Sequence, residues 1–142
     1  RALRLAPTHP GANHYWIHLM ESSAHPGEAQ ASADRLTRLV PGSGHLTHMP
    51  AHIHMRTGRY AAAVAANERA IAADERYVGQ VDAQGAYRVG YVAHNRHFLW
   101  AAAAMLGGWV GSEYGSRRVS QLTLQRLLAV VLVIAGFKLI IA

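Results

Sequence analysis

The segment His14-Tyr-Trp-Ile-His18 is matched 34 residues later by His48-Met-Pro-Ala-His52, and this spacing decides the fold. In both segments the two histidines are four residues apart. The same lag of 34 residues relates further identical residues along the chain: Arg1, Arg35 and Arg69; Arg4 and Arg38; Leu5 and Leu39; Pro7 and Pro41; Ala29 and Ala63. Self-similarity at a fixed period of this length indicates stacked helical units. The sequence therefore predicts an all-α fold.

The residues after Gly58 carry a family resemblance. The segment Gly58-Arg-Tyr-Ala-Ala-Ala-Val-Ala-Ala-Asn-Glu-Arg-Ala-Ile-Ala-Ala-Asp74 resembles the second helix of a tetratricopeptide repeat (TPR). The segments His48-Met-Pro-Ala-His-Ile53, His94-Asn-Arg-His-Phe-Leu99 and His14-Tyr-Trp-Ile-His18 are similar to a histidine-rich bacterial branch of that superfamily. The resemblance covers residues 1–107, about 2.5 repeats, and implies a TPR-like helix–turn–helix solenoid. It implies no particular activity for that branch.

The repeat register predicts the positions of individual helices. They are expected at residues 12–22 and 28–39 in the first unit, at 47–57 and 61–73 in the second, and from near His94 onward. Pro50 is tolerated in a helix only within the first turn. Thr47 is therefore expected as the N-cap of the third helix, with His48 and His52 both on that helix.

The composition narrows the class of protein. The 142 residues suffice for one domain, and because the first seven resemble the end of a repeat helix, we expect a fragment of a longer protein. Cysteine is absent, which excludes disulfides and thiolate metal sites. The net charge of +6 is spread thinly along the chain. Nucleic-acid binders concentrate positive charge on one face, so no nucleic-acid partner is expected.

The composition changes near residue 107, and residues 108–142 form a second predicted region, a glycine-rich linker followed by a hydrophobic helix. Residues 122–142 are mostly apolar and long enough to span a bilayer. The positive-inside rule, applied to the arginines upstream, predicts membrane association with the repeats on the cytoplasmic side. A buried core helix is the alternative, because the uninterrupted apolar run covers only the 11 residues 127–137.

This C-terminal region also resembles a known family. The segments Gly107-Gly-Trp-Val-Gly-Ser-Glu-Tyr-Gly-Ser-Arg-Arg118 and Leu124-Gln-Arg-Leu-Leu-Ala-Val-Val-Leu-Val-Ile-Ala-Gly-Phe-Lys-Leu139 resemble the end of sulfite-exporter (TauE/SafE-type) permeases. The resemblance implies a glycine-rich helix, a short basic loop and a final transmembrane helix. One alternative is therefore that the chain is the terminal fragment of such a permease. The joining of this region to the repeats could reflect a genuine fusion, a frameshifted reading frame or an assembly artefact.

Histidines and one glutamate fall on three predicted helical stripes, because residues three or four apart share one face of a helix. The stripes are His14, His18 and Glu21; His45, His48, His52 and Met55; and His94 and His97. His45 is expected to precede its helix and is not among the predicted ligands. The predicted metal ligands are His14, His18, Glu21, His48, His52, His94 and His97. Imidazole and carboxylate without thiolate suit a divalent transition metal: zinc, copper, nickel or iron.

Several functions remain open at this point. The leading prediction is a scaffold or binding module whose concave groove is lined by histidines and holds a metal, or a protein or peptide partner. The first alternative is a metal-dependent enzyme with Glu21 as acid, base or ligand, although the His-Glu-x-x-His signature of zinc proteases is absent. If the histidines bind no metal, they would be polar residues of the groove or hydrogen-bonded residues of the core. His9, His25 and His54 lie off the stripes and are expected at the surface or in packing.

Overall fold

The protein is built from helices alone over the part that can be described. A computed structural model describes residues 1–141, without the side chains of residues 135, 136 and 138–141. Within that range no strand is present, which confirms the all-α prediction. The chain divides into two compact units, Arg1–Leu106 and Gly107–Ala142.

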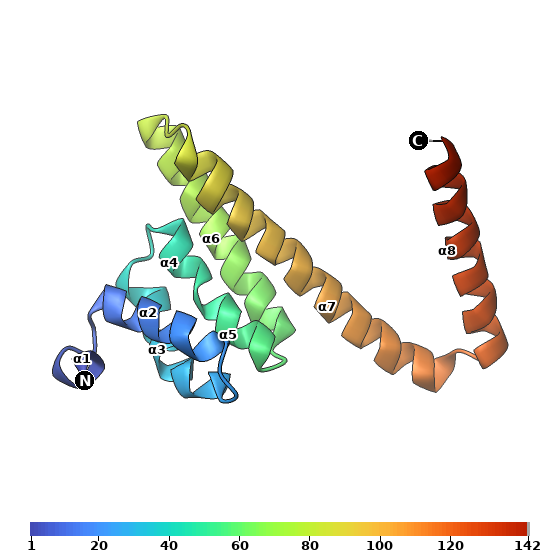
Figure 1. Ribbon diagram of the computed structural model, residues 1–142, viewed down its shortest axis with the longest axis horizontal. Helices are drawn as coiled ribbons and strands as arrows, with labels where there is room; N and C mark the ends of the chain where they lie inside the picture. The colour runs from blue at the N-terminus through green and yellow to red at the C-terminus, as the bar shows by residue number, and fades with distance from the viewer. Residues whose placement is uncertain (142) are drawn as a thin grey trace. The chain divides into compact units, whose positions relative to one another are not determined.

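The first unit opens with helices whose starts are set by local sequence. α1 spans Ala2–Leu5, α2 spans Pro10–Glu21, a 3-10 turn η1 spans Pro26–Ala29, and α3 spans Gln30–Leu39. His9 caps α2 by accepting a hydrogen bond from the backbone N–H of Ala12, and Pro10 occupies the first turn, where its missing N–H costs nothing. α2 then packs against α3 and η1 (Figure 1).

The predicted helix at residues 47–57 is in fact two helices. α4 spans Gly44–His48 and α5 spans Pro50–Arg56, with a break at Met49. Ser43, not Thr47, is the N-cap, and it accepts from the backbone N–H of Leu46. Pro50 lacks an N–H and therefore starts a new helix instead of lying in the first turn of a continuous one.

α6 extends further than the repeat pattern predicts. It spans Tyr60–Val81, beginning after Gly58, whose φ of +73° suits glycine, and packs against α4 and α5. It ends at Asp82, a left-handed residue with φ of 44°. A π-helical segment, η2, spans Tyr87–Val92 and leads into α7, Ala93–Arg118. Figure 1 shows the start of α7 running back alongside α6.

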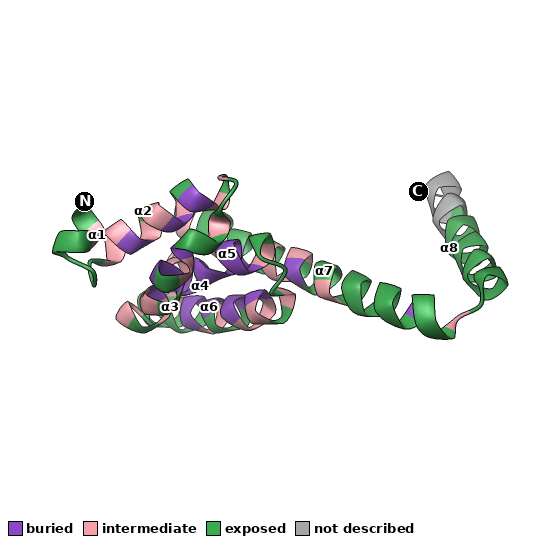
Figure 2. Ribbon diagram, turned by 90° about the horizontal axis from the view of Figure 1, so that it is seen from below, coloured by how far each residue is buried: buried purple, intermediate pink, exposed green. Residues whose placement is uncertain are grey.

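The first unit contains two apolar clusters. One joins α2, α3 and α5 through fully buried side chains such as Ile17, Leu36 and Ile53. The other is built from small residues: Ala51 of α5, Ala63 and Ala66 of α6, and Ala102 of α7. The small alanine side chains let α5, α6 and α7 approach one another closely. Figure 2 shows buried positions along α2, α5 and α6.

The second unit contains the end of α7 and α8, Gln121–Ile141. The glycines at 107, 108, 111 and 115 lie inside α7, where a linker was expected. α8 begins with polar residues, including Gln125 and Arg126, and its uninterrupted apolar run of 11 residues covers only about 16 Å, against the ~30 Å of a bilayer core.

The transmembrane prediction is wrong for the part of the chain that the structure describes. None of the helices there combines the length and the apolar character that crossing a membrane requires. Of the predicted span 122–142, residues 135, 136 and 138–142 lie outside the described side chains. The membrane partner and the cytoplasmic orientation of the repeats were inferred from that span, and both stay predictions.

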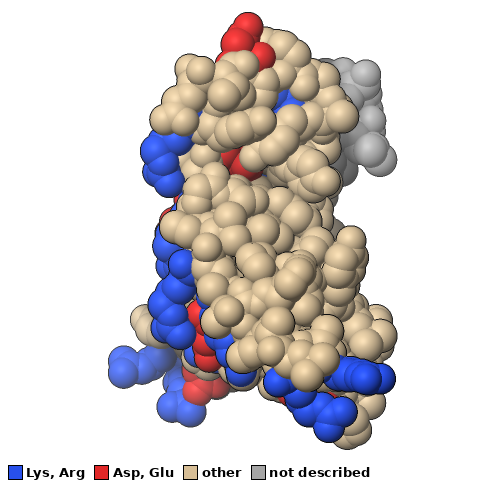
Figure 3. Space-filling view, turned by 90° about the vertical axis from the view of Figure 1, so that its left-hand side faces the viewer, with Lys and Arg blue, Asp and Glu red and all other residues tan. Residues whose placement is uncertain are grey.

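Charged side chains are unevenly placed on the face drawn in Figure 3. Lys and Arg lie mainly along one edge and at one end, where Asp and Glu are interspersed, while uncharged residues fill the centre. On this face the positive charge is therefore peripheral.

Candidate metal centre

Six histidines from four helices form two groups of three in the first unit. Triad A consists of His14, His18 and His45, and triad B consists of His48, His52 and His94. In each triad, one ligand atom from every ring lies within 4.8 Å of the other two. Each triad could hold a metal ion. His14 and His18 come from α2, His45 and His48 from α4, His52 from α5 and His94 from α7.

The protonation of His48 follows from its hydrogen-bond partner. The Nδ2 amide of Asn67 donates to the backbone carbonyl of Ala63 at 2.8 Å, which orients Oδ1 of the same side chain toward His48. His48 Nδ1 lies 2.7 Å from that Oδ1, and an amide oxygen can only accept. The Nδ1 atom of His48 therefore carries the proton, and its Nε2 carries a lone pair.

The same argument applies to His52. Its Nδ1 contacts the Oε2 atom of Glu21, and an ionised carboxylate only accepts. In the neutral ring, His52 Nε2 is then also a lone pair. The two Nε2 atoms of His48 and His52 nevertheless lie 2.8 Å apart. Two lone pairs at this distance repel, unless a cation lies between them.

His94 completes triad B. Its Nε2 lies 3.0 Å from the Nε2 of His48, so three ring nitrogens converge on one place. Imidazole nitrogens bound to zinc at about 2.0–2.1 Å, at angles of about 90–110°, are themselves about 2.8–3.4 Å apart. The observed separations of 2.8 and 3.0 Å lie at the short end of that range.

Triad A also brings ring nitrogens close together next to Glu21, but its three histidines are only half-buried. His14 Nε2 lies 3.1 Å from His45 Nε2, and His18 Nδ1 lies 2.7 Å from Glu21 Oε1. Because His18 Nδ1 donates to Glu21, the lone pair of the neutral His18 ring is on its Nε2 atom. His45 Nδ1 is buried and has no hydrogen-bond partner among the described residues.

Glu21 links the two triads. One carboxylate oxygen accepts from His18 of triad A and the other from His52 of triad B. A carboxylate behind a ligating histidine fixes the ring orientation and raises the basicity of the ligating nitrogen. The backbone at Glu21 is itself held, because the guanidinium of Arg56 donates to the carbonyls of Glu21 at 2.9 Å and Ser23 at 3.3 Å.

Burial keeps the rings neutral. Burial, with further contributions from neighbouring histidines, lowers the pKa of His48 and of His52 to about 3, although the hydrogen bond that His48 donates to Asn67 opposes the effect at His48. The pKa of His45 is lowered to about 4 for the same main reason. Burial also lowers the pKa values of His14 and His94. The neutral imidazole is the form that binds metals.

A buried carboxylate positions His94. Asp74, with no exposed surface, accepts hydrogen bonds from the Tyr87 hydroxyl and from the Nδ2 amide of Asn95, each at 2.7 Å. Gly44, at the start of α4, lies against this carboxylate: a Cβ atom there would be 1.8 Å from Asp74 Oδ1. Asp74 thus ties the start of α7, and with it His94, to α4 and α6.

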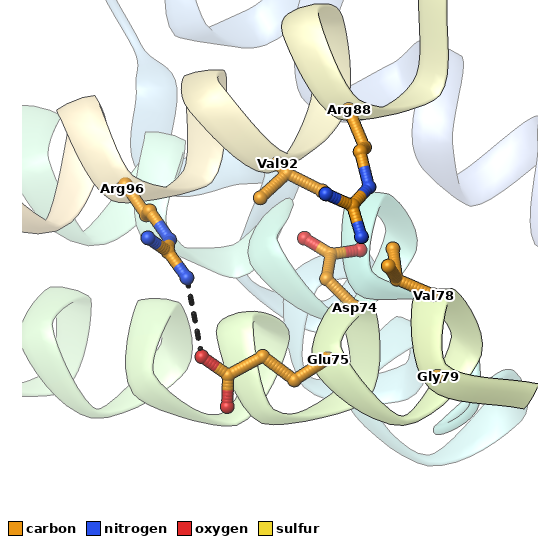
Figure 4. Close-up of a pocket in the computed structure, with 7 residues that line it drawn as sticks. All are labelled: Asp74, Glu75, Val78, Gly79, Arg88, Val92 and Arg96. Atoms are coloured by element: carbon orange, nitrogen blue, oxygen red, sulfur yellow. Dashed lines mark hydrogen bonds and ion pairs between the residues drawn. The ribbon is translucent and has the colours of Figure 1, made fainter. Parts of the chain in front are cut away.

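A separate cavity of about 430 Å³ lies between α6 and the η2–α7 segment (Figure 4). Its lining residues are Asp74, Glu75, Val78, Gly79, Arg88, Val92 and Arg96. Arg96 donates to Glu75 at 3.2 Å, and Arg88 donates to the Ala83 carbonyl at 3.0 Å. None of these lining residues belongs to either triad, so the cavity is distinct from the histidine cluster.

Six of the seven predicted ligand residues lie in or against the cluster, and His97 does not. His97 is exposed and lies beside Trp100, with ring centroids 6.3 Å apart. The prediction also left out His45, which belongs to triad A. Its spacing of three residues from His48 was the available signal. Asn67 was not predicted at all, because the repeat pattern assigns it no special place.

The remaining histidines have separate positions. His9 caps α2, and His25 is exposed before η1. His54 is 7% exposed and belongs to neither triad.

Comparison of this chain with known proteins identifies no relatives. No family model, no curated protein and no solved structure matches this chain. The resemblances to TPR proteins and to sulfite-exporter permeases therefore have no support from these comparisons.

Proposed function

We propose that this chain is a helical metal-binding module that holds a divalent transition metal in its histidine cluster. The carrying observation is the 2.8 Å separation of His48 Nε2 and His52 Nε2. Both nitrogens carry lone pairs in the neutral rings, since the Nδ1–H groups of the same rings donate to Asn67 and Glu21. A cation turns that repulsion into coordination.

The ligand chemistry narrows the choice of metal. Three imidazole ligands, with no thiolate or carboxylate ligand, suit zinc, copper, nickel and ferrous iron. They do not suit magnesium or calcium, which prefer oxygen ligands. The Nδ1–H groups of triad histidines donate hydrogen bonds to Glu21 and Asn67, and such outer contacts usually accompany metal-bound histidine.

A metal-dependent enzyme is the second candidate. Three protein ligands leave a fourth position for water or substrate, as in catalytic zinc sites, whereas structural zinc sites are closed by four ligands. Glu21 stands behind two of the histidines, so its role in such an enzyme would be to orient ligands.

The test is a calorimetric titration of the metal-free chain with Zn²⁺ at neutral pH. Two histidines on α7 supply matched variants: His94 belongs to triad B, and His97, three residues further on, is exposed outside both triads. We expect His94→Ala to weaken zinc binding at triad B by at least tenfold, and His97→Ala to leave zinc binding unchanged. Absence of heat in the unmodified chain, or equal losses in the two variants, would overturn the proposal.

A further inference from the structure

The two triads are close enough to act on each other. The rings of His18 and His52, one from each triad, have centroids 5.3 Å apart, and those of His45 and His48 are 6.1 Å apart. Two ions bound in the triads would therefore be near neighbours, as in two-metal sites.

Glu21 is placed between the triads as a shared group. Its side chain is 26% exposed, and its two oxygens contact His18 Nδ1 and His52 Nδ1. A change in one triad is transmitted to the other through this carboxylate, because moving either oxygen moves both contacts. Among residues outside the triads, Glu21 is therefore positioned to couple the two.

The charges of the cluster indicate what else would bind there. The six imidazoles are neutral ligands, and the carboxylates close to the cluster are Glu21 and Asp74. Two divalent ions would bring four positive charges against these two negative ones. The remaining positive charge and the open coordination positions favour a small anion, such as hydroxide formed from metal-bound water.

We propose that triads A and B form one dinuclear centre, in which two divalent ions are coupled through Glu21 and share an exogenous small anion. This inference rests on the proposed metal binding and extends it to the number of ions and to the class of ligand. It assigns His45, which completes triad A, a role equal to that of His94 in triad B.

The test uses Cu²⁺, whose unpaired electron reports on a neighbouring ion. The full chain is titrated with Cu²⁺ at neutral pH, bound copper is counted by elemental analysis, and electron paramagnetic resonance spectra are recorded with and without azide. We expect two coppers per chain and a spectrum broadened or diminished by spin coupling. Azide, a small anion, should shift the absorption and the resonance of the coupled pair.

Single-triad variants provide the comparison. His14→Ala and His94→Ala change rings that are not buried, and circular dichroism verifies that their helices are retained. Each variant should bind one copper and give an uncoupled spectrum of full intensity for that ion. Glu21→Gln should keep two coppers with altered coupling.

The outcomes separate the two proposals. No bound copper and no bound zinc would overturn metal binding altogether. One copper per chain, or two without spin coupling, would leave the metal-binding module in place and overturn the dinuclear centre. Two coupled coppers unaffected by azide would overturn the shared anion.

Discussion

The Nε2 atoms of His48 and His52 lie 2.8 Å apart, while the Nδ1 atom of each ring faces an oxygen acceptor. Neither ring can donate to the other when both are neutral. The helices bring the two nitrogens together nonetheless, because α4 and α5 are joined directly through Met49 and both pack on α6. The fold thus maintains an arrangement that a bound cation would stabilise.

The metal-free chain should lose stability in acid. His48 and His52 have pKa values of about 3 in the folded chain and about 6.5 when unfolded. Below pH 6.5 the unfolded state therefore binds more protons, and the free energy of unfolding falls as the pH falls, by roughly 1 kcal/mol per pH unit or more for the pair. Urea unfolding in the presence of a chelator should show a lower midpoint at pH 5 than at pH 7. An unchanged midpoint would contradict the neutral, buried rings.

Metal should stabilise the chain at neutral pH. A ligand at 100 times its dissociation constant raises the free energy of unfolding by about 2.7 kcal/mol when it binds only the folded state. Zinc should therefore raise the melting temperature at pH 7, and much less at pH 5, because protons compete for the ligating nitrogens. His18→Ala, which changes triad A, and His52→Ala, which changes triad B, should each reduce the shift, and the exposed His25→Ala should leave it intact. Equal shifts in all three variants would contradict the assigned site.

Asn67 should matter for metal affinity beyond its contribution to stability. Asn67→Leu removes the acceptor that orients His48 and should lower metal affinity by about 10–100-fold. Asn13→Leu is the matched control, since Asn13 is equally buried; it donates to the carbonyls of Pro7 and His9 and accepts from Arg35. Both variants should lose about 1–3 kcal/mol of stability. A similar loss of affinity in both would show that Asn67 acts through the fold alone.

The close approach of Gly44 to Asp74 gives a test of the local packing. A Cβ atom at Gly44 would overlap the Asp74 carboxylate, which is held in place by Tyr87 and Asn95. Gly44→Ala should therefore destabilise the chain by about 3 kcal/mol, the upper end for overpacking. Gly42→Ala adds a methyl group with nothing within 4 Å and should change stability by less than about 0.5 kcal/mol. Chemical denaturation of both variants measures the difference.

The first histidine stripe could be predicted because it depends on periodicity within one helix: a spacing of four residues places His14 and His18 on one face of α2. The prediction that His48 and His52 share one helix is wrong, since they lie on α4 and α5. The helix break at Met49 was missed, since a proline in a first turn and a proline that starts a new helix look alike in sequence.

Tertiary contacts account for most of the remaining errors. His97 has the same spacing from His94 as a stripe requires, yet it turns to Trp100, because the direction of α7 relative to α4 decides which face meets the cluster. Asn67 and Asp74 act through partners 19 and 21 residues away, His48 and Asn95. The transmembrane prediction gave too much weight to overall length and too little to the short uninterrupted run at 127–137.

X-ray absorption spectroscopy at the zinc edge tests the central claim most directly. The chain is loaded with one equivalent of Zn²⁺ at pH 7, washed free of unbound ion and measured together with His48→Ala. Metal binding by the histidine triads predicts a first shell of nitrogen or oxygen neighbours at about 2.0–2.1 Å, with the multiple-scattering pattern of imidazole. That pattern should weaken in the variant. A spectrum of hydrated zinc, or no zinc retained after washing, would contradict the account.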